Sequence, residues 1–70
     1  MEMQTTFLRL PDVMRITGLA RATIYEMIDE GRFPRQVRLS TRIAVWVFPE
    51  IQEWMAAKIA ARDATAARYR

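Results

Sequence analysis

Apolar residues recur every three or four positions in two short segments near the N-terminus. Such spacing places apolar side chains on one face of a helix, so it predicts two amphipathic helices, Pro11 to about Thr17 and about Arg21 to Glu30. The opposite face of the second helix is left exposed. We expect the two apolar faces to share one small core, made of Val13, Ile16, Leu19, Ile24 and Ile28, with Met14 and Met27 filling around it.

Proline and glycine mark the ends of these helices. Pro11 has a fixed φ and no N–H, which suits the first helical position, and Asp12 adds a carboxylate where the helix dipole favours negative charge. Gly18 can take a positive φ without a Cβ clash, so it ends the first helix and redirects the chain. Gly31 ends the second helix in the same way. Two short helices joined by a tight turn predict a helix-turn-helix.

The pattern changes from helical to extended after Gly31. The pair Phe33-Pro34 enforces a non-helical conformation, because a residue before proline avoids the helical region. Two segments with β-type patterns follow, Gln36 to Leu39 and Ile43 to Phe48, so we predict a β-hairpin. Such a hairpin in a DNA-binding protein would be a wing. The polar link between the two segments is Ser40, Thr41 and Arg42.

A third helix is predicted to begin at Pro49, again as a first-turn proline, with Glu50 in the favoured acidic position. Trp46 and Trp54 are assigned to packing in the small core. We also expect Phe7 or Leu8 to pack against the third helix. The predicted apolar stripe of the third helix is Ile51, Trp54, Met55 and Ile59, and in the hairpin Val37 and Leu39 share one face with Arg38 on the other.

These elements predict a fold that is mainly α with a small β-hairpin, a winged helix-turn-helix, over residues 7–62. We expect residues 1–6 and 63–70 to be flexible termini. A chain of 70 residues is one small domain, which cannot hold a large substrate cavity. It has no cysteine and no histidine, and its carboxylates do not cluster, so nothing indicates an enzyme, a cofactor or a metal site. No signal peptide or membrane span is visible, and we expect a cytoplasmic location without membrane or small-molecule partners.

The charge distribution suits a polyanionic partner. The net charge is +3 and the sequence pI is about 10.2. From Gly31 to Pro49 no acidic residue occurs, and every basic residue there is arginine, whose planar fork matches phosphate and guanine edges. A solvated charged face is the alternative interpretation of this pattern.

The candidate DNA contacts lie in the second helix and the hairpin. In a helix-turn-helix, the N-terminal part of the second helix meets base edges, and a wing contacts the backbone or a minor groove. Arg21 is the strongest candidate, for a base or a phosphate, whereas Tyr25 could equally be an amphipathic residue at the core edge. Glu26 and Asp29 either accept from a cytosine amino group or hold arginines such as Arg21 and Arg32 in position. The predicted contact residues are Arg21, Ala22, Thr23, Tyr25, Glu26, Arg35, Arg38, Ser40, Thr41 and Arg42.

Four motifs stand in one order along the chain: FLRLPDV, TGL-x-R-x-TIY, EGRFPR-x-VRL and W-x(7)-W. With them, the stretch from Phe7 to Arg62 resembles the AlpA family of prophage transcriptional regulators. The resemblance implies a winged helix-turn-helix related to MerR-type and excisionase domains. It also implies a sequence-specific DNA-binding regulator of a prophage or integrated element, acting for example on an integrase gene.

The chain departs from the family pattern in two places. Ala20 stands where the family usually has a serine that caps the recognition helix, which removes an N-cap worth about 1 kcal/mol. Phe48-Pro49 stands where a polar cap before the third helix is usual, and Val47 where a charged residue is common.

Two other functions remain open. An excisionase-like architectural protein would use the same surface to bend DNA, and a protein-interaction module such as an antirepressor would use the alanine-rich third helix and Trp54. For the DNA-binding hypotheses the partner is double-stranded DNA. A single small domain offers a small footprint, so we expect homodimers or cooperative assembly on DNA.

Overall fold

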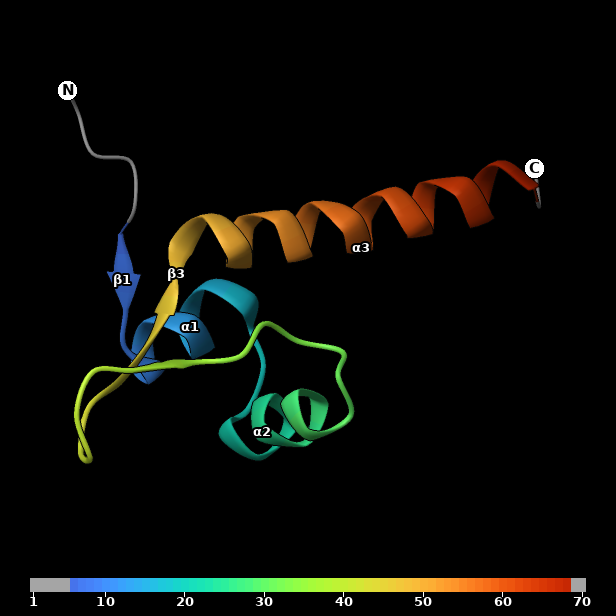
Figure 1. The fold of residues 1–70 in the computed structure, drawn as a ribbon. Helices are drawn as coiled ribbons and strands as arrows, with labels where there is room; N and C mark the ends of the chain where they lie inside the picture. Colours follow the sequence, from blue (N-terminus) through green and yellow to red (C-terminus); the bar gives the residue numbers. More distant parts are fainter. Residues whose placement is uncertain (1–5, 69–70) are drawn as a thin grey trace, which may run out of the picture.

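The computed structural model describes residues 6–68, with side chains described as far as residue 65. Within that range the elements alternate from a strand through two helices to a hairpin and a last helix (Figure 1). Each predicted helix is present: the first two begin and end within one residue of the expected positions, and the third begins one residue before Pro49. The elements in chain order are β1 (Phe7–Leu8), α1 (Leu10–Thr17), α2 (Arg21–Asp29), β2 (Val37–Arg38), β3 (Ala44–Val47) and α3 (Phe48–Arg68).

Gly18 and Gly31 end α1 and α2 as expected, each with a positive φ, of 76° and 74°. The Gly18 N–H donates to the Met14 carbonyl at 2.8 Å, which is the simple left-handed helix cap. After α2 the Gly31 N–H donates to Ile28, and the Arg32 N–H donates to Met27 at 2.8 Å, the two bonds of a Schellman motif. Both helix ends are therefore sharp turns specified by glycine.

The strands form one antiparallel sheet in the order β1-β3-β2. The predicted hairpin supplies β2 and β3, with Val37 opposite Val45. Strand β1 was not predicted: it pairs with β3, placing Phe7 opposite Val47. Of the two residues expected to pack against the third helix, Leu8 packs against the core that includes Ile51 of that helix, whereas Phe7 is exposed on the edge strand.

The core lies between α1, α2, one face of the sheet and the first turns of α3. Leu8, Leu19, Ile28 and Trp54 are partly buried against it. Ile16, which was expected in the core, is 36% exposed, and Ile59, which was expected on the apolar stripe of the third helix, is 53% exposed. The buried residues of the core are Val13, Ile24, Met27, Phe33, Trp46 and Ile51.

Helix α3 has two parts with different surroundings. Ile51 is fully buried, and Trp54 and Met55 pack against the core. Every described residue from Ala56 to Thr65 is exposed, and Figure 1 shows this part projecting from the body of the molecule. Residues 63–68, which we expected to belong to a flexible terminus, continue the helix, whereas residues 1–5 and 69–70 lie outside the described range. No helix in the described range is long and apolar enough to cross a membrane.

Candidate nucleic-acid interface

Helix α2 buries one side and exposes the other. Ile24 and Met27 are buried, and Ile28 packs against the core, so one face of the helix is fixed to the domain. Thr23 is half-buried at the boundary between the two faces. The exposed residues follow helical spacing and form one continuous stripe: Arg21, Ala22, Tyr25, Glu26 and Asp29. Four of the five candidates predicted on this helix therefore share one outward surface.

The N-terminus of α2 lacks a side-chain cap. Ala20 has the extended backbone of an N-cap residue, with φ −76° and ψ 157°, but makes no side-chain hydrogen bond. The first N–H groups of an α-helix have no partner within the helix. At the start of α2 these donors are left for solvent or for an anion, and the helix dipole adds a positive potential there.

Tyr25 lies at the edge of the core. Its ring meets Trp46 edge to face, with centroids 6.3 Å apart and planes at 62°. Trp46 is itself fully buried, and its Nε1–H donates to the Pro34 carbonyl at 3.1 Å. At 37% exposure Tyr25 keeps part of its side chain outside. Its packing role is thus realised, and it anchors one side of the exposed stripe to the core.

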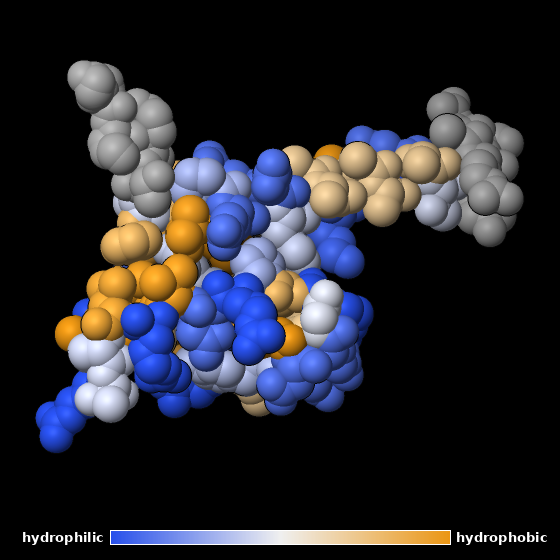
Figure 2. All heavy atoms as spheres, viewed as in Figure 1, coloured by the Kyte–Doolittle hydropathy of each residue, from blue (hydrophilic) through white to orange (hydrophobic). Residues whose placement is uncertain are grey.

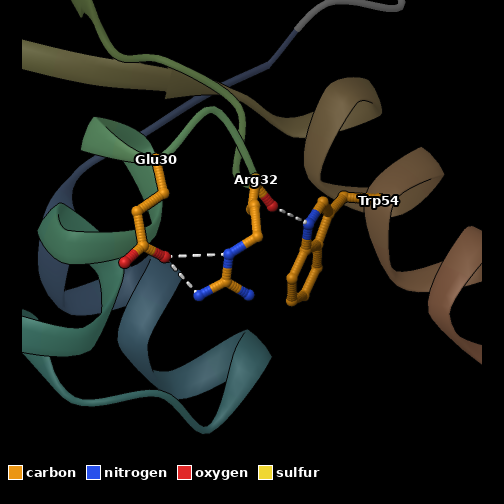
Figure 3. Close-up of polar contacts among 3 residues, drawn as sticks. All are labelled: Glu30, Arg32 and Trp54. Atoms are coloured by element: carbon orange, nitrogen blue, oxygen red, sulfur yellow. Dashed lines mark hydrogen bonds and ion pairs between the residues drawn. The ribbon is translucent and has the colours of Figure 1, made fainter.

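The ion pairs of the described residues do not involve the candidate arginines. Among the described residues, no ion pair includes Arg21, Arg35, Arg38 or Arg42. Of the two roles left open for Glu26 and Asp29, an ion pair with Arg32 is not seen among the described residues. The carboxylate that holds Arg32 is Glu30, which accepts from Arg32 Nε at 2.8 Å (Figure 3).

The hairpin ends in a polar, exposed tip. The Leu39 N–H donates to the Ile43 carbonyl at 2.8 Å and closes the loop. Within the loop the Ser40 hydroxyl accepts from the Arg42 N–H at 3.2 Å, and Arg38 reaches the Thr41 carbonyl at 3.4 Å. Residues 38–43 are all exposed. The tip therefore presents two guanidinium groups and two hydroxyls on a short, internally bonded loop.

The two candidate elements lie on the same side of the molecule. Figure 1 shows α2 and the hairpin tip on the side away from α3. Arg35 is exposed in the link between α2 and β2. Figure 2 shows hydrophilic side chains over α2 and at the end of the hairpin. The helix stripe, the link and the tip carry every predicted contact residue except Thr23, which is half-buried.

Arg32 is a further exposed arginine of the link that the sequence analysis did not include among the contacts. Its carbonyl accepts from Trp54 Nε1 at 2.7 Å, which ties the link after α2 to α3 (Figure 3). The Trp54 ring also meets Phe33 edge to face at 4.8 Å, and Lys58 lies 5.5 Å above its centre. The signal in the sequence was the acid-free stretch that begins at Gly31, of which Arg32 is the first arginine.

A helix-turn-helix followed by a β-hairpin and a further helix defines a winged helix-turn-helix protein. The chain belongs to the AlpA family, because residues 6–59 match the family described as Prophage CP4-57 regulatory protein (AlpA).

Two curated relatives are similar to most of this chain. An uncharacterized protein of Enterobacteria phage P4, ORF88, is 49% identical over 59 residues, which cover 84% of this chain and 67% of that protein. The DNA-binding transcriptional activator AlpA of Escherichia coli (strain K12) is 39% identical over 54 residues, covering 69% of this chain and 77% of the relative.

Proposed function

We propose that this chain is a sequence-specific DNA-binding transcriptional regulator of a prophage or integrated element. Helix α2 enters the major groove with its exposed stripe, and the hairpin tip contacts the backbone or an adjacent minor groove. The observation that carries the proposal is the exposed stripe of α2, which is fixed to the core by Ile24 and Met27. The similarity to a relative named as a DNA-binding transcriptional activator supports it.

Charge and hydrogen-bonding capacity support the assignment of contacts. Arg21 stands in the first turn of α2, where side chains of a recognition helix reach base edges. Arginine bound bidentately to guanine is the commonest specific pairing, worth about 1–3 kcal/mol of discrimination. Arg38 and Arg42 at the tip match phosphate oxygens or a narrow minor groove, where positive side chains are favoured.

In-vitro selection from a random duplex library tests the proposal. Selection at about 150 mM salt suppresses binding that rests on phosphate charge alone. An enriched motif is expected, because base readout adds an energy that non-specific binding lacks. Absence of any enriched motif would refute sequence-specific regulation.

Two matched variants then assign the contact surface. Arg21→Ala should weaken binding to the selected duplex by about tenfold or more, the low end of a bidentate base contact. Arg62→Ala removes the same charge from the projecting part of α3, where Arg62 pairs with Asp63, and should change affinity less than about twofold. Equal effects of the two substitutions would mean that α2 is not the reading helix.

The same duplexes separate the proposal from its alternatives. Binding without a motif but with strong bending in a circular-permutation gel would indicate an excisionase-like architectural role. Capture of a protein partner that survives both Arg21→Ala and Arg38→Ala would indicate an interaction module.

A further inference from the structure

The sheet has two faces that differ in what covers them. Alternate residues of a strand point to opposite faces. Leu8 and Trp46, which are paired across β1 and β3, point to the core. Each residue on the other face is apolar and uncharged. We call these residues the outer sheet face: Phe7, Val37, Leu39, Ile43, Val45 and Val47.

The register places these six side chains together. Phe7 is opposite Val47 and Val37 is opposite Val45, and the bond from the Leu39 N–H to the Ile43 carbonyl continues the hairpin pairing. Val45 is only 3% exposed although it is not part of the core cluster. The outer sheet face therefore has a packed centre. Figure 2 shows hydrophobic side chains gathered over the strands and the hairpin.

The rim of the outer sheet face is open. Phe7 is 51% exposed and Leu39 52%, and Val37 and Ile43 are also exposed. Together these side chains leave apolar surface on the order of 300 Å², the size of the largest patch on an ordinary monomer. The exposure is confined to the rim, since Val45 and Val47 of the central strand are buried and half-buried. The largest patch of an ordinary monomer is often functional, and the continuity of this one across the three strands favours an interaction surface.

The size of the face indicates which partner covers it. A stable complex in solution buries about 800 Å² on each partner, more than this face offers. A contact this small is effective only where something else holds the partners together. Two copies of the chain on neighbouring sites of one duplex meet that condition, because the DNA raises their effective concentration.

Charge favours a second copy on DNA as well. Two chains of net charge +3 repel each other in solution. The outer sheet face itself carries no ionised group, although Arg38 and Arg42 lie close to Leu39 at one end of it. The phosphates of a shared duplex would offset the remaining repulsion.

We propose that the outer sheet face is the contact through which copies of this chain bind DNA cooperatively. This inference rests on the proposed DNA-binding function and names the surface that adds cooperativity to it. Neighbouring copies meet through Phe7 and Leu39, and each copy keeps its α2 stripe for the duplex.

The test compares one-site and two-site duplexes made from the selected motif, with site spacings varied over one helical turn, about 10 bp. At the best spacing, the wild-type chain should bind the second site with roughly tenfold higher affinity than the first. This cooperativity factor lies within the usual range of coupling between sites. Phe7→Thr and Leu39→Thr keep strand propensity but remove apolar surface, and each should abolish that factor. Phe7→Thr, which lies away from the hairpin tip, should also leave one-site affinity within about twofold. Circular dichroism checks that both variants are folded.

Ile59→Gln is the matched control. Ile59 is 53% exposed, close to Phe7 and Leu39, but lies on the projecting part of α3. Its substitution should leave the cooperativity factor unchanged. Equal loss in Ile59→Gln would overturn the assignment to the sheet.

The outcomes separate this inference from the proposed function. One-site binding without cooperativity at any spacing, or cooperativity that survives both threonine variants, overturns the inference and leaves DNA binding intact. If wild type binds no duplex, the proposed function fails and the inference fails with it. Loss of cooperativity only in Phe7→Thr and Leu39→Thr supports both.

Discussion

Restoring a side-chain cap to α2 should make the domain more stable, and Ala20→Ser is the change that does so. Ala20 already has the extended backbone of an N-cap residue, and its carbonyl accepts from the Ile24 N–H at 3.0 Å. A serine hydroxyl at this position reaches an N–H of the first turn without any backbone movement. Ala20 is exposed, so the added oxygen is not buried.

The expected gain follows from the cost of the reverse change. Replacing a serine cap by alanine costs about 1 kcal/mol, within a range of about 0.5–2. For a small domain 1 kcal/mol corresponds to about 4–8 °C in Tm. In urea, with a slope of about 1 kcal/mol per molar, the unfolding midpoint should rise by about 1 M.

Urea and thermal unfolding followed by circular dichroism measure this gain. Ala22→Ser is the control, because it makes the same chemical change two residues later, inside the exposed face of α2. Serine is a poorer helix former than alanine, so Ala22→Ser should lose up to about 0.5 kcal/mol. If Ala20→Ser is no more stable than the parent chain, or if Ala22→Ser gains as much, the reasoning from the uncapped helix is refuted.

Three further predictions concern the turn, the link and the hairpin. Gly18→Ala should lose about 1 kcal/mol in urea unfolding, because φ is 76° while nothing lies within 4 Å of the added Cβ; a smaller loss is expected for Gly18→Asn, and equal stability would contradict the backbone argument. Trp54→Phe should lose about 1 kcal/mol with the bond to the Arg32 carbonyl, and an unchanged urea midpoint would mean that water replaces it. Arg38→Ala should lower the slope of log affinity against log salt by about 0.9, measured by fluorescence anisotropy, and an unchanged slope would place Arg38 away from phosphate.

The first two helices, their ends and the start of the third helix were predictable because their signals are local. Gly18 and Gly31 adopt the positive φ expected of them, and Pro11 stands in the first turn of α1. The uncapped start of α2 at Ala20 was also visible in the sequence. Capping and turn formation depend on a few consecutive residues, so all the residues that take part are neighbours in the sequence.

The errors arise where an interaction joins distant segments. Strand β1 is two residues long and exists through its pairing with β3, which no local pattern around Phe7 reveals. Ile59 continues the apolar stripe of α3, but it lies beyond the last residues of α3 that pack against the core. Periodicity predicts which face of a helix is apolar, but it does not predict how far along the helix the rest of the domain covers that face. Ile16, predicted in the core, is 36% exposed.

The candidate site was predictable to a similar degree. Helical spacing predicted which side of α2 is exposed, and the acid-free stretch predicted a basic hairpin. The pairing of Arg32 with Glu30 could not be inferred, because several carboxylates lie within reach of that arginine along the sequence. The outer sheet face left a signal in β3, where Ala44, Val45, Trp46 and Val47 are apolar without alternation and indicate that both faces of the strand bear apolar side chains.

The two parts of α3 give a single continuous helix two levels of protection against hydrogen exchange. Around Ile51, amide hydrogens can exchange only when the core itself opens, so their rates report the global free energy of unfolding. Between Ala56 and Thr65 no side chain is buried, and the helix depends there on the intrinsic preference of its alanines. Amides in that part should exchange through local fraying, at rates close to those of an isolated peptide. A plot of amide exchange rate against residue number along α3 would therefore locate the residue at which tertiary packing stops stabilising the helix.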